Sequence, residues 1–239
     1  MRPRISLIIP AFNEERELPG LLKSVAVARQ RFCDDPEAVE VIVANNASTD
    51  RTAELALAQG CTIVHVSHRC IASARNGGAQ VACAPVLAFV DADSRLHPQT
   101  FNAVEKTLSP KVVVGATGVR MSRSSLGIAF TMLIVAAVTR IGRTGPGVVF
   151  CRRSDWEAVG GFDESYRYAE DVRFQLDLKR LGRTRGQHFA WAKGVRTVTS
   201  ARKFDRYGDW HVFGLVWNWL RGPETFNRFV QRYWYDSER

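Results

Sequence analysis

Segments with strand patterning and segments with helix patterning alternate along the first half of this chain. Short apolar runs rich in β-branched residues, which are typical of buried strands, occur at residues 5–9, 39–44, 62–66 and 86–90. Between them, apolar residues recur at helical spacing, as at Leu18, Leu21, Leu22 and Val25. Repeated strand–helix–strand units form right-handed crossovers and parallel strand pairs. The sequence therefore predicts an α/β fold with a mostly parallel sheet flanked by helices.

The fourth of these strands ends in two acidic residues. Asp91 and Asp93 directly follow the run 86–90, and their spacing places both side chains on one face of an extended chain. Parallel α/β sheets bind ligands at the carboxyl ends of their strands. Two neighbouring carboxylates repel each other unless a cation neutralises them, and a divalent metal that carries substrate phosphates would do so. A solvated Asp-x-Asp turn is the alternative that this stretch leaves open.

Polar residues also follow the other predicted strands. Glu14, Asn46 and Arg75 should meet the two aspartates along one edge of the sheet, since the carboxyl ends of parallel strands share that edge. The chain has neither a GxGxxG fingerprint nor a GxxxxGK[ST] loop. We therefore expect that a nucleotide bound at this edge is held by side chains on loops and by a metal.

Charge and cysteine content narrow the class of partner. The 239 residues carry a formal net charge of +9 with a pI of about 9.7, which favours anionic partners such as nucleotide phosphates or a membrane surface. No nucleic-acid-binding motif is present, so we expect no nucleic-acid partner.

The five cysteines are odd in number and form no CxxC pair, which indicates a reducing compartment. Since the N-terminus runs directly into a strand, we expect no signal peptide and a cytoplasmic location.

Six short motifs occur along the chain: IIPAFNE at 8–14, NNASTD at 45–50, ARNG at 74–77, FVDAD at 89–93, GGFDE at 160–164 and ED at 170–171. In these motifs and their order the sequence resembles glycosyltransferase family 2, the inverting nucleotide-sugar transferases of the GT-A fold. The resemblance covers residues 5–181. It implies a GT-A, Rossmann-like domain over residues 1–204, with a nucleotide-binding half at 1–95 and an acceptor half at 96–204.

The resemblance also implies a role for each site residue. A nucleotide-sugar donor would lie against Pro10, Phe12, Glu14, Asn46, Arg75 and Asp91, with Glu14 and Asn46 around the ribose and the base. Asp93 would bind a divalent metal, Mn²⁺ or Mg²⁺, with Asp91 as a further candidate ligand. Gly161, Phe162 and Asp163 would lie on the acceptor side. A turn whose Phe162 side chain only fills the core is the alternative.

The adjacent acids Glu170 and Asp171 open a predicted helix. Neighbouring residues on a helix do not face the same way, so only one of these carboxylates can point fully into the cleft. Following the family, we expect Asp171 to be the general base that removes a proton from the acceptor hydroxyl, and Glu170 to orient it or the acceptor. Both acids could instead serve only the helix dipole.

Residues 45–46 depart from the family, which usually has two acids there. The Asn carbonyl can accept the uracil N3–H, and its amide can donate to a ring carbonyl. Guanine presents two adjacent donors that suit a carboxylate better, so we expect a UDP-sugar. The departure also leaves open a catalytically inactive nucleotide- or lipid-binding module. A nucleotidyltransferase ranks low, because the chain lacks a glycine-rich basic loop after the first strand.

Two further residues are weaker candidates. His188 could be another metal ligand, although a single histidine is more often structural. Arg202 follows a predicted strand and could contact the diphosphate, and a solvated basic loop explains it equally well.

Residues 124–139 carry no charge and are flanked by arginines. Sixteen residues are too few to span a bilayer. We expect either a buried or oligomer-contacting helix or a helix at a membrane surface that receives a lipid acceptor.

Residues 205–239 form a predicted aromatic, helical C-terminal appendage with interleaved arginines, which suits packing on the domain, a protein interface or a membrane–water interface. The acceptor class therefore stays open among a lipid, a small metabolite and a glycan.

Overall fold

The computed structural model describes residues 2–32, 35–166 and 169–210. The chain forms two compact units. The first comprises the residues up to Arg120 together with Arg143–Thr199, and the second comprises Met121–Gly142 together with the described residues from Ser200 onward. This division differs from the predicted boundary after residue 204, because a helix within 121–142 shares a small apolar core with the segment after Ser200. Most of the predicted extension lies outside the described residues.

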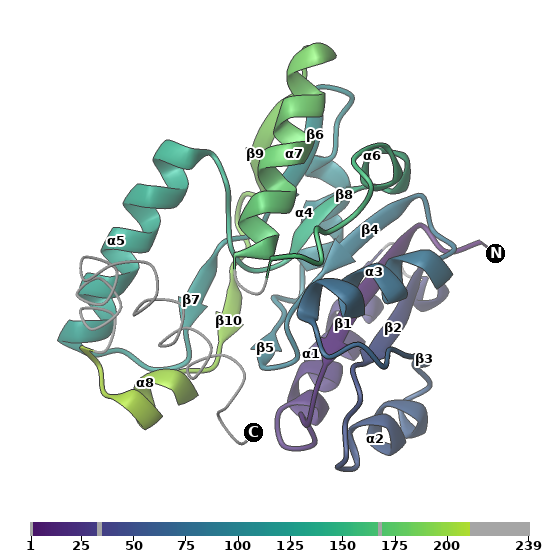
Figure 1. Cartoon of the computed structure of the whole chain (residues 1–239), viewed down its shortest axis with the longest axis vertical. Helices are drawn as coiled ribbons and strands as arrows, with labels where there is room; N and C mark the ends of the chain where they lie inside the picture. Colours follow the sequence, from purple (N-terminus) through teal and green to yellow (C-terminus); the bar gives the residue numbers. More distant parts are fainter. Residues whose placement is uncertain (1, 33–34, 167–168, 211–239) are drawn as a thin grey trace. The chain divides into compact units, whose positions relative to one another are not determined.

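A seven-stranded sheet forms the centre of the first unit, in the order β3-β2-β1-β4-β8-β6-β9 (Figure 1). Its strands are β1 (Ile5–Ala11), β2 (Val39–Asn45), β3 (Thr62–His65), β4 (Val86–Phe89), β6 (Val112–Ala116), β8 (Val149–Arg152) and β9 (His188–Trp191). β1 pairs in parallel with β2 and with β4, and β2 pairs in parallel with β3. β8 runs antiparallel to both β4 and β6. The prediction of a mostly parallel sheet is confirmed.

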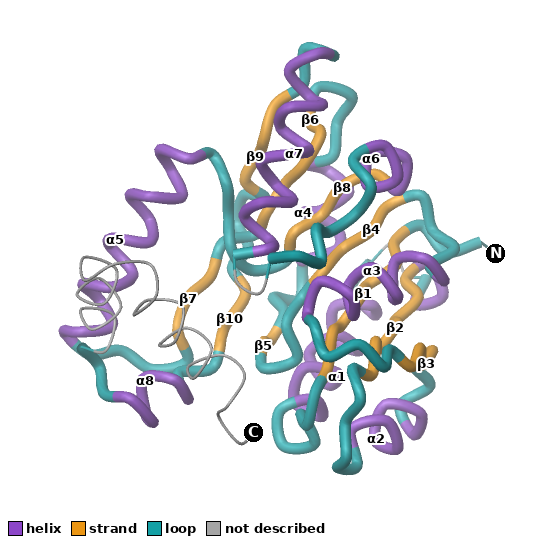
Figure 2. The backbone as a smooth tube through the Cα atoms, in the orientation of Figure 1, coloured by secondary structure: helices purple, strands orange, loops and turns teal. Residues whose placement is uncertain are grey.

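Helices cover both faces of this sheet, as the alternation of the predicted segments requires (Figure 2). The alternating side chains of β1 separate the two cores. Leu7 and Ile9 pack with residues of α1 and α4, whereas Ile8 packs with residues of α3 and α7. The helices of this unit are α1 (Leu18–Gln30), η1 (Pro36–Ala38, a 3-10 turn), α2 (Thr52–Ala58), α3 (Ile71–Val81), α4 (Thr100–Thr107), α6 (Arg153–Ala158) and α7 (Glu170–Thr184).

A second, three-stranded sheet has the order β5-β10-β7 and consists of β5 (Ser94–Arg95), β10 (Thr197–Thr199) and β7 (Val119–Met121). β5 begins directly after Asp93. Its antiparallel pairing with β10 sets Thr199 opposite Ser94. The segment that carries the two aspartates is therefore fixed at both ends, by β4 before it and by β5 after it.

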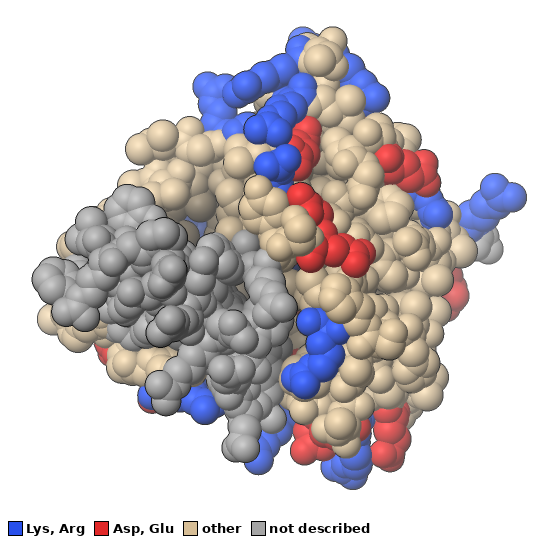
Figure 3. Space-filling view, viewed as in Figure 1, with Lys and Arg blue, Asp and Glu red and all other residues tan. Residues whose placement is uncertain are grey.

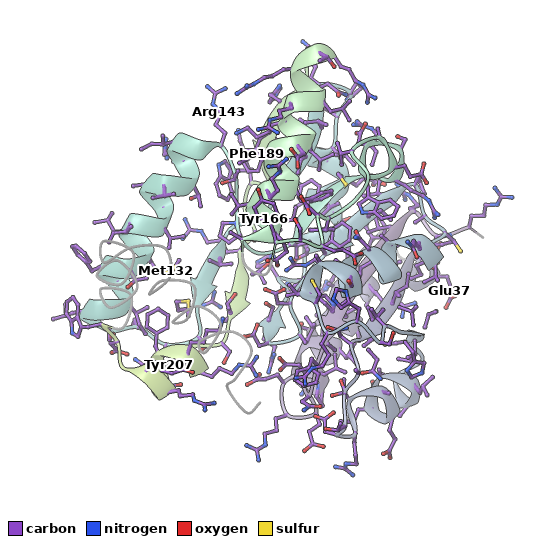
Figure 4. The ribbon with its side chains drawn as sticks, in the orientation of Figure 1. Glu37, Met132, Arg143, Tyr166, Phe189 and Tyr207 are labelled. Atoms are coloured by element: carbon purple, nitrogen blue, oxygen red, sulfur yellow. The ribbon has the colours of Figure 1, made fainter. Side chains whose placement is uncertain are left out.

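The second unit contains α5 (Leu126–Gly142) and α8 (Arg202–Tyr207). Ile128 of α5 packs against Ala201 and Phe204. Figure 4 labels Met132 on α5, which lies against this core, and Tyr207 at the end of α8. Arg123 forms ion pairs with Asp205 and Asp209. These contacts join the start of α5 to the segment around α8.

Most of the apolar side chains of α5 are exposed. Leu126 is 84 % exposed and Ile141 is 85 % exposed, with Leu133 and Val138 between them also exposed. These exposures contradict the expectation of a buried helix, and they leave contact with another molecule as the remaining prediction for this stretch. Among the described residues, no helix combines the length and the apolarity that a membrane crossing requires.

The sheet leaves no room for a side chain at Gly115 of β6. A Cβ atom there would lie 2.3 Å from Cζ of the Phe150 ring on β8. We therefore expect Gly115→Ala to lower the free energy of unfolding by about 1–3 kcal/mol through overpacking, measured by urea denaturation. Because the closest clash is with the Phe150 ring, adding Phe150→Leu should lower stability by less than the sum of the two single effects. Additive effects would contradict this packing.

Candidate functional site at the carboxyl edge of the large sheet

The parallel strands β1, β2 and β4 end at the same edge of the large sheet. Ala11 pairs with Asn45, and the backbone amide of Asn46 then donates to the Ala11 carbonyl. The apolar run that predicts the first strand ends at residue 9, but β1 continues through Pro10 to Ala11. The proline is tolerated there because the pairing of β1 with β4 ends earlier, at Ile8. Pro10 is buried in the strand.

The loop after β1 is fixed by the loop after β2. Asn13 adopts a left-handed backbone conformation with φ of 52°, and its side-chain oxygen accepts a hydrogen bond from the Thr49 amide at 2.8 Å. The backbone amide of Glu14 donates to Thr52 Oγ1, also at 2.8 Å. These bonds hold Glu14 in place while it is only 3 % exposed. Glu14 is thus a buried carboxylate at the carboxyl edge of the sheet.

The amide of Asn46 is bound to the protein itself. Its Nδ2 donates to the Val66 carbonyl at 3.1 Å and to the His68 carbonyl at 2.6 Å. Both amide protons are therefore used, and the expectation that this amide donates to a ring carbonyl does not hold. No hydrogen bond from any described residue reaches its Oδ1, so the group that Asn46 offers a ligand is an acceptor.

The loop that Asn46 holds carries Arg69. The Arg69 guanidinium lies over the ring of Phe12, 4.1 Å from its centroid. Phe12 follows β1, and Arg69 follows β3. A cation–π contact thus joins the segments after two strands, β1 and β3, that flank β2.

Arg75 of α3 links the two acidic segments of the site. Its guanidinium donates to Glu170 at 2.5 Å and to Asp91 at 2.8 Å. The side chains of Arg75 and Glu170 are 7 % and 8 % exposed, whereas that of Asp91 is 56 % exposed. Arg75 therefore forms one buried and one partly solvated ion pair, and it joins the segment after β4 to the first turn of α7.

The burial of this ion pair shifts both pKa values. Burial raises the pKa of Glu170 above its ordinary value, although the Arg75 charge acts in the opposite direction. Burial alone would lower the pKa of Arg75, but the charges of Asp91 and Glu170 outweigh it and raise that pKa. Glu170 is thus a buried carboxylate whose charged form depends on one partner.

Asp171 and Asp93 differ from Glu170 in their surroundings, since both are partly exposed. One oxygen of Asp171 accepts a hydrogen bond from the Val172 amide at 2.8 Å, as expected at a helix start. Figure 3 shows acidic side chains on the surface between the start of α7 and α3. The site therefore offers accessible carboxylates next to a buried ion pair.

The turn of residues 160–164 packs against both α3 and α7. The Asn76 side chain donates to the Phe162 carbonyl and accepts from the Phe162 amide, each at 2.8 Å. The Phe162 ring stacks on Phe174 of α7 with centroids 4.0 Å apart. Gly161 has φ of 76°, and a Cβ there would lie 2.6 Å from Asn76 Oδ1. Phe162 is thus buried in the core, while Asp163 is exposed.

One of the predicted residues lies at the other edge of the sheet, and another belongs to the second unit. His188 is the first residue of β9, which β8 and β6 separate from β4. Because β9 runs parallel to β6 and β6 runs in the direction of β4, His188 lies at the opposite edge of the sheet from Asp93. His188 therefore cannot complete a metal site there. Arg202 is the first residue of α8 in the second unit, so its contact with the diphosphate stays a prediction.

Comparison with known proteins identifies the family. The model of glycosyl transferase family 2 matches residues 6–132, just over half of the 239-residue chain, and the chain belongs to that family. The 4,4'-diaponeurosporenoate glycosyltransferase of Staphylococcus haemolyticus is 38% identical over 100 residues, which are 39% of this chain and 25% of the relative. The validoxylamine A glucosyltransferase of Streptomyces hygroscopicus subsp. limoneus is 36% identical over 109 residues, 43% of this chain and 23% of the relative. The chain thus spans about a quarter of these two curated relatives.

Solved structures of glycosyltransferases share the fold. The mannosyltransferase PcManGT of Pyrobaculum calidifontis, in complex with GDP-Man and Mn²⁺, superposes with a TM-score of 0.67 at 21% identity, covering 86% of this chain and 61% of that one. Glucosyl-3-phosphoglycerate synthase of Mycobacterium tuberculosis, with Mn²⁺, UDP and glucosyl-3-phosphoglycerate, gives 0.62 at 17% identity, covering 86% and 75%. At these identities the likeness establishes the GT-A fold.

The Arg75–Glu170 pair generates a stability prediction. Arg75→Gln leaves the buried Glu170 charge without a partner and should lower the free energy of unfolding by about 3–5 kcal/mol at pH 7. Adding Glu170→Gln should recover part of that loss, since no buried charge then remains. In Arg75→Gln alone the loss should shrink as the pH falls, because a carboxyl group whose folded pKa is raised stabilises the fold when it is protonated.

Urea denaturation of the wild type, Arg75→Gln and the double variant at pH 5 and pH 7 measures both effects. An equal loss in the single and the double variant would show that Glu170 is not destabilised by losing Arg75.

Proposed function

We propose that the chain is an inverting glycosyltransferase that moves a sugar from a nucleotide-sugar, with UDP as the preferred nucleotide, to an acceptor hydroxyl. The observation that carries this proposal is the bridge from Arg75 to Asp91 and Glu170. It joins the strand edge that would bind the donor to the helix whose first turn would act on the acceptor. A purely structural ion pair would not require the accessible acids Asp93 and Asp171 beside it.

The two acids at the start of α7 suit different roles. Glu170 is buried and bonded to Arg75, so its carboxylate is not available to an acceptor hydroxyl. Asp171 is partly exposed, and we assign it as the general base. The acceptor oxygen attacks the anomeric carbon while the bond to the nucleoside diphosphate breaks, and Asp171 takes the hydroxyl proton. A single displacement of this kind inverts the anomeric centre.

The residues after β4 fit a divalent metal that is held partly by the substrate. No group of three or more His, Cys, Asp or Glu side chains in the described part of the chain could hold a metal ion unaided. Asp93, with Asp91 beside it, offers the hard oxygen ligands that Mn²⁺ or Mg²⁺ takes, and the donor's diphosphate would supply the remaining oxygens. When bound, such a metal would neutralise the charge that develops on the leaving diphosphate. Two structural neighbours were solved with Mn²⁺.

Asn46 supports uracil as the base. With both amide protons bound to the Val66 and His68 carbonyls, Asn46 offers a base only its Oδ1, which can accept the N3–H of uracil or the N1–H of guanine. Guanine's adjacent second donor suits a carboxylate better than an amide, so we keep uracil as the preferred base. Cytosine and adenine carry acceptors at the equivalent ring position and would face this oxygen without a hydrogen bond. Among the structural neighbours, TarS from Staphylococcus aureus was solved with UDP-GlcNAc or UDP, whereas PcManGT was solved with GDP-Man.

The exposed apolar side chains of α5 suit an acceptor or partner with an apolar surface. Leu126, Leu133, Val138 and Ile141 are exposed, and Arg140 stands in the last turn. Apolar residues with a terminal cation fit the boundary between headgroups and acyl chains of an anionic membrane. We therefore propose α5 as the contact through which this protein would approach a lipid surface.

Nucleotide binding tests the donor site. We expect UDP with Mn²⁺ to raise the free energy of unfolding by about 2.7 kcal/mol at a hundredfold excess over Kd, and CDP or ADP to have a much smaller effect. Asp93→Asn should abolish the dependence on Mn²⁺. Thermal denaturation with each nucleotide, with and without the metal, measures this. Stabilisation by GDP alone would contradict the assignment of uracil, and no stabilisation by any nucleotide would favour an inactive module.

Turnover tests the assignment of the acids. Asp171→Asn should bind UDP as the wild type does, while the release of UDP from UDP-glucose or UDP-N-acetylglucosamine falls at least a hundredfold, in line with the loss of a general base. Glu157→Gln, on the surface of α6, serves as the control. If Asp171→Asn keeps the wild-type rate, the general base lies elsewhere.

A further inference from the structure

A chain of hydrogen bonds runs from Asn46 to the turn of residues 160–164. Asn46 Nδ2 donates to the His68 carbonyl, and the His68 ring Nδ1 lies 2.9 Å from Ser73 Oγ. Ser73 Oγ lies 2.5 Å from Glu164 Oε2. Asn46, His68 and Ser73 follow or begin elements of the predicted nucleotide-binding half, whereas Glu164 belongs to the turn that the family resemblance assigns to the acceptor side. The bonds therefore join residues 118 positions apart, from 46 to 164.

The donor and the acceptor of each hydrogen bond in this series can be assigned in one consistent way. The hydrogen bonds from Ser73 and Asn76 lower the pKa of Glu164, so its carboxylate only accepts hydrogen bonds. Ser73 has one hydroxyl proton, and it must point to Glu164. The Ser73 oxygen then accepts from His68, so the Nδ1 atom of His68 carries a proton. Every link is thus directed from the loop after β3 toward Glu164.

At its other end, this series of hydrogen bonds holds the turn of residues 160–164 in place. Glu164 Oε1 accepts a hydrogen bond from Asn76 Nδ2 at 2.9 Å. The same Asn76 side chain bonds both the amide and the carbonyl of Phe162. The Phe162 ring stacks on Phe174, one turn after Glu170 and Asp171. A displacement of Glu164 would therefore change the position of the turn against α7.

We propose that His68, Ser73 and Glu164 form a positioning relay that transmits occupancy of the nucleobase site to the acceptor-side turn 160–164. The proposal rests on the donor site described under Proposed function. A base that donates to Asn46 Oδ1 fixes the Asn46 side chain, and with it the His68 carbonyl. The ordered loop then holds Ser73 and Glu164 in their bonded geometry, so the turn is ordered before the acceptor arrives.

The coupling needs no large movement. The side chains of His68 and Glu164 are 68 % and 45 % exposed, so both ends of the relay lie in surface segments that can open locally. A ligand that orders one such segment lowers the free energy needed to order a second segment that is hydrogen-bonded to it. The relay would give ordered binding, with the donor before the acceptor.

Hydrogen exchange with and without UDP and Mn²⁺ tests the relay. In the wild type, UDP should slow the exchange of amides in residues 66–70 and also in residues 160–166. In Ser73→Ala the slowing at 66–70 should persist, while the slowing at 160–166 should fall to less than a quarter of its wild-type size. Alanine is a good helix former, so α3 should be retained, and thermal denaturation checks this. Glu164→Gln should behave as Ser73→Ala does, and Glu157→Gln should behave as the wild type.

The outcomes separate the relay from the function on which it rests. If UDP slows exchange at neither segment of the wild type, the donor site itself is wrong, and the relay falls with it. If UDP slows both segments equally in the wild type and in Ser73→Ala, the donor site stands and the relay is overturned. Kinetics give a second readout: Ser73→Ala should keep the KM for UDP-sugar within about twofold while kcat for UDP release falls about tenfold, or 1.4 kcal/mol. A rise in KM alone would contradict a positioning role.

Discussion

The buried guanidinium of Arg75 stands between carboxylates from two distant parts of the chain. Glu170 is as buried as Arg75 and depends on it for its charged form, whereas Asp91 faces solvent. An arginine suits this place because its planar group donates in two directions at once and stays charged at any physiological pH. The segment after β4 and the first turn of α7 are therefore held at a fixed separation, which a reaction between two substrates at this edge would require.

α3 is the element that makes this possible. One turn of the helix carries Ser73, Arg75 and Asn76, which bind the Glu164 carboxylate, the buried ion pair and the turn around Phe162. Its small residues let it lie close to the sheet: a Cβ at Gly78 would approach Ile8 Cγ2 of β1 to 2.5 Å. The stretch 71–81 thus packs tightly through small side chains and presents its polar ones to the site. The proposed donor and acceptor sides meet on this one helix.

Much of the fold could be predicted from the sequence, whereas the geometry of the site could be predicted only in part. Apolar runs at 5–9, 39–44 and 86–90 marked the parallel strands, because burial on both faces demands continuous apolar residues. The order of the strands in the sheet could not be predicted from the sequence. For that reason His188 was a candidate ligand for the same metal as Asp93, although it lies at the opposite edge of the sheet. The Arg75–Glu170 pair was missed because 95 positions separate its members. The two adjacent asparagines were recognised as a departure from the family, but only the contacts of the Asn46 amide with two carbonyls show that this side chain offers a ligand an acceptor.

The edge that Arg75 organises would carry an inverting transfer from a UDP-sugar. The most direct measurement is proton NMR of the sugar released when the protein turns over UDP-α-glucose with water as the acceptor, recorded before the two anomers interconvert. A single displacement predicts that β-glucose appears first. First appearance of α-glucose would contradict the proposed displacement, and the absence of any released glucose while UDP binds would contradict the assignment as a transferase.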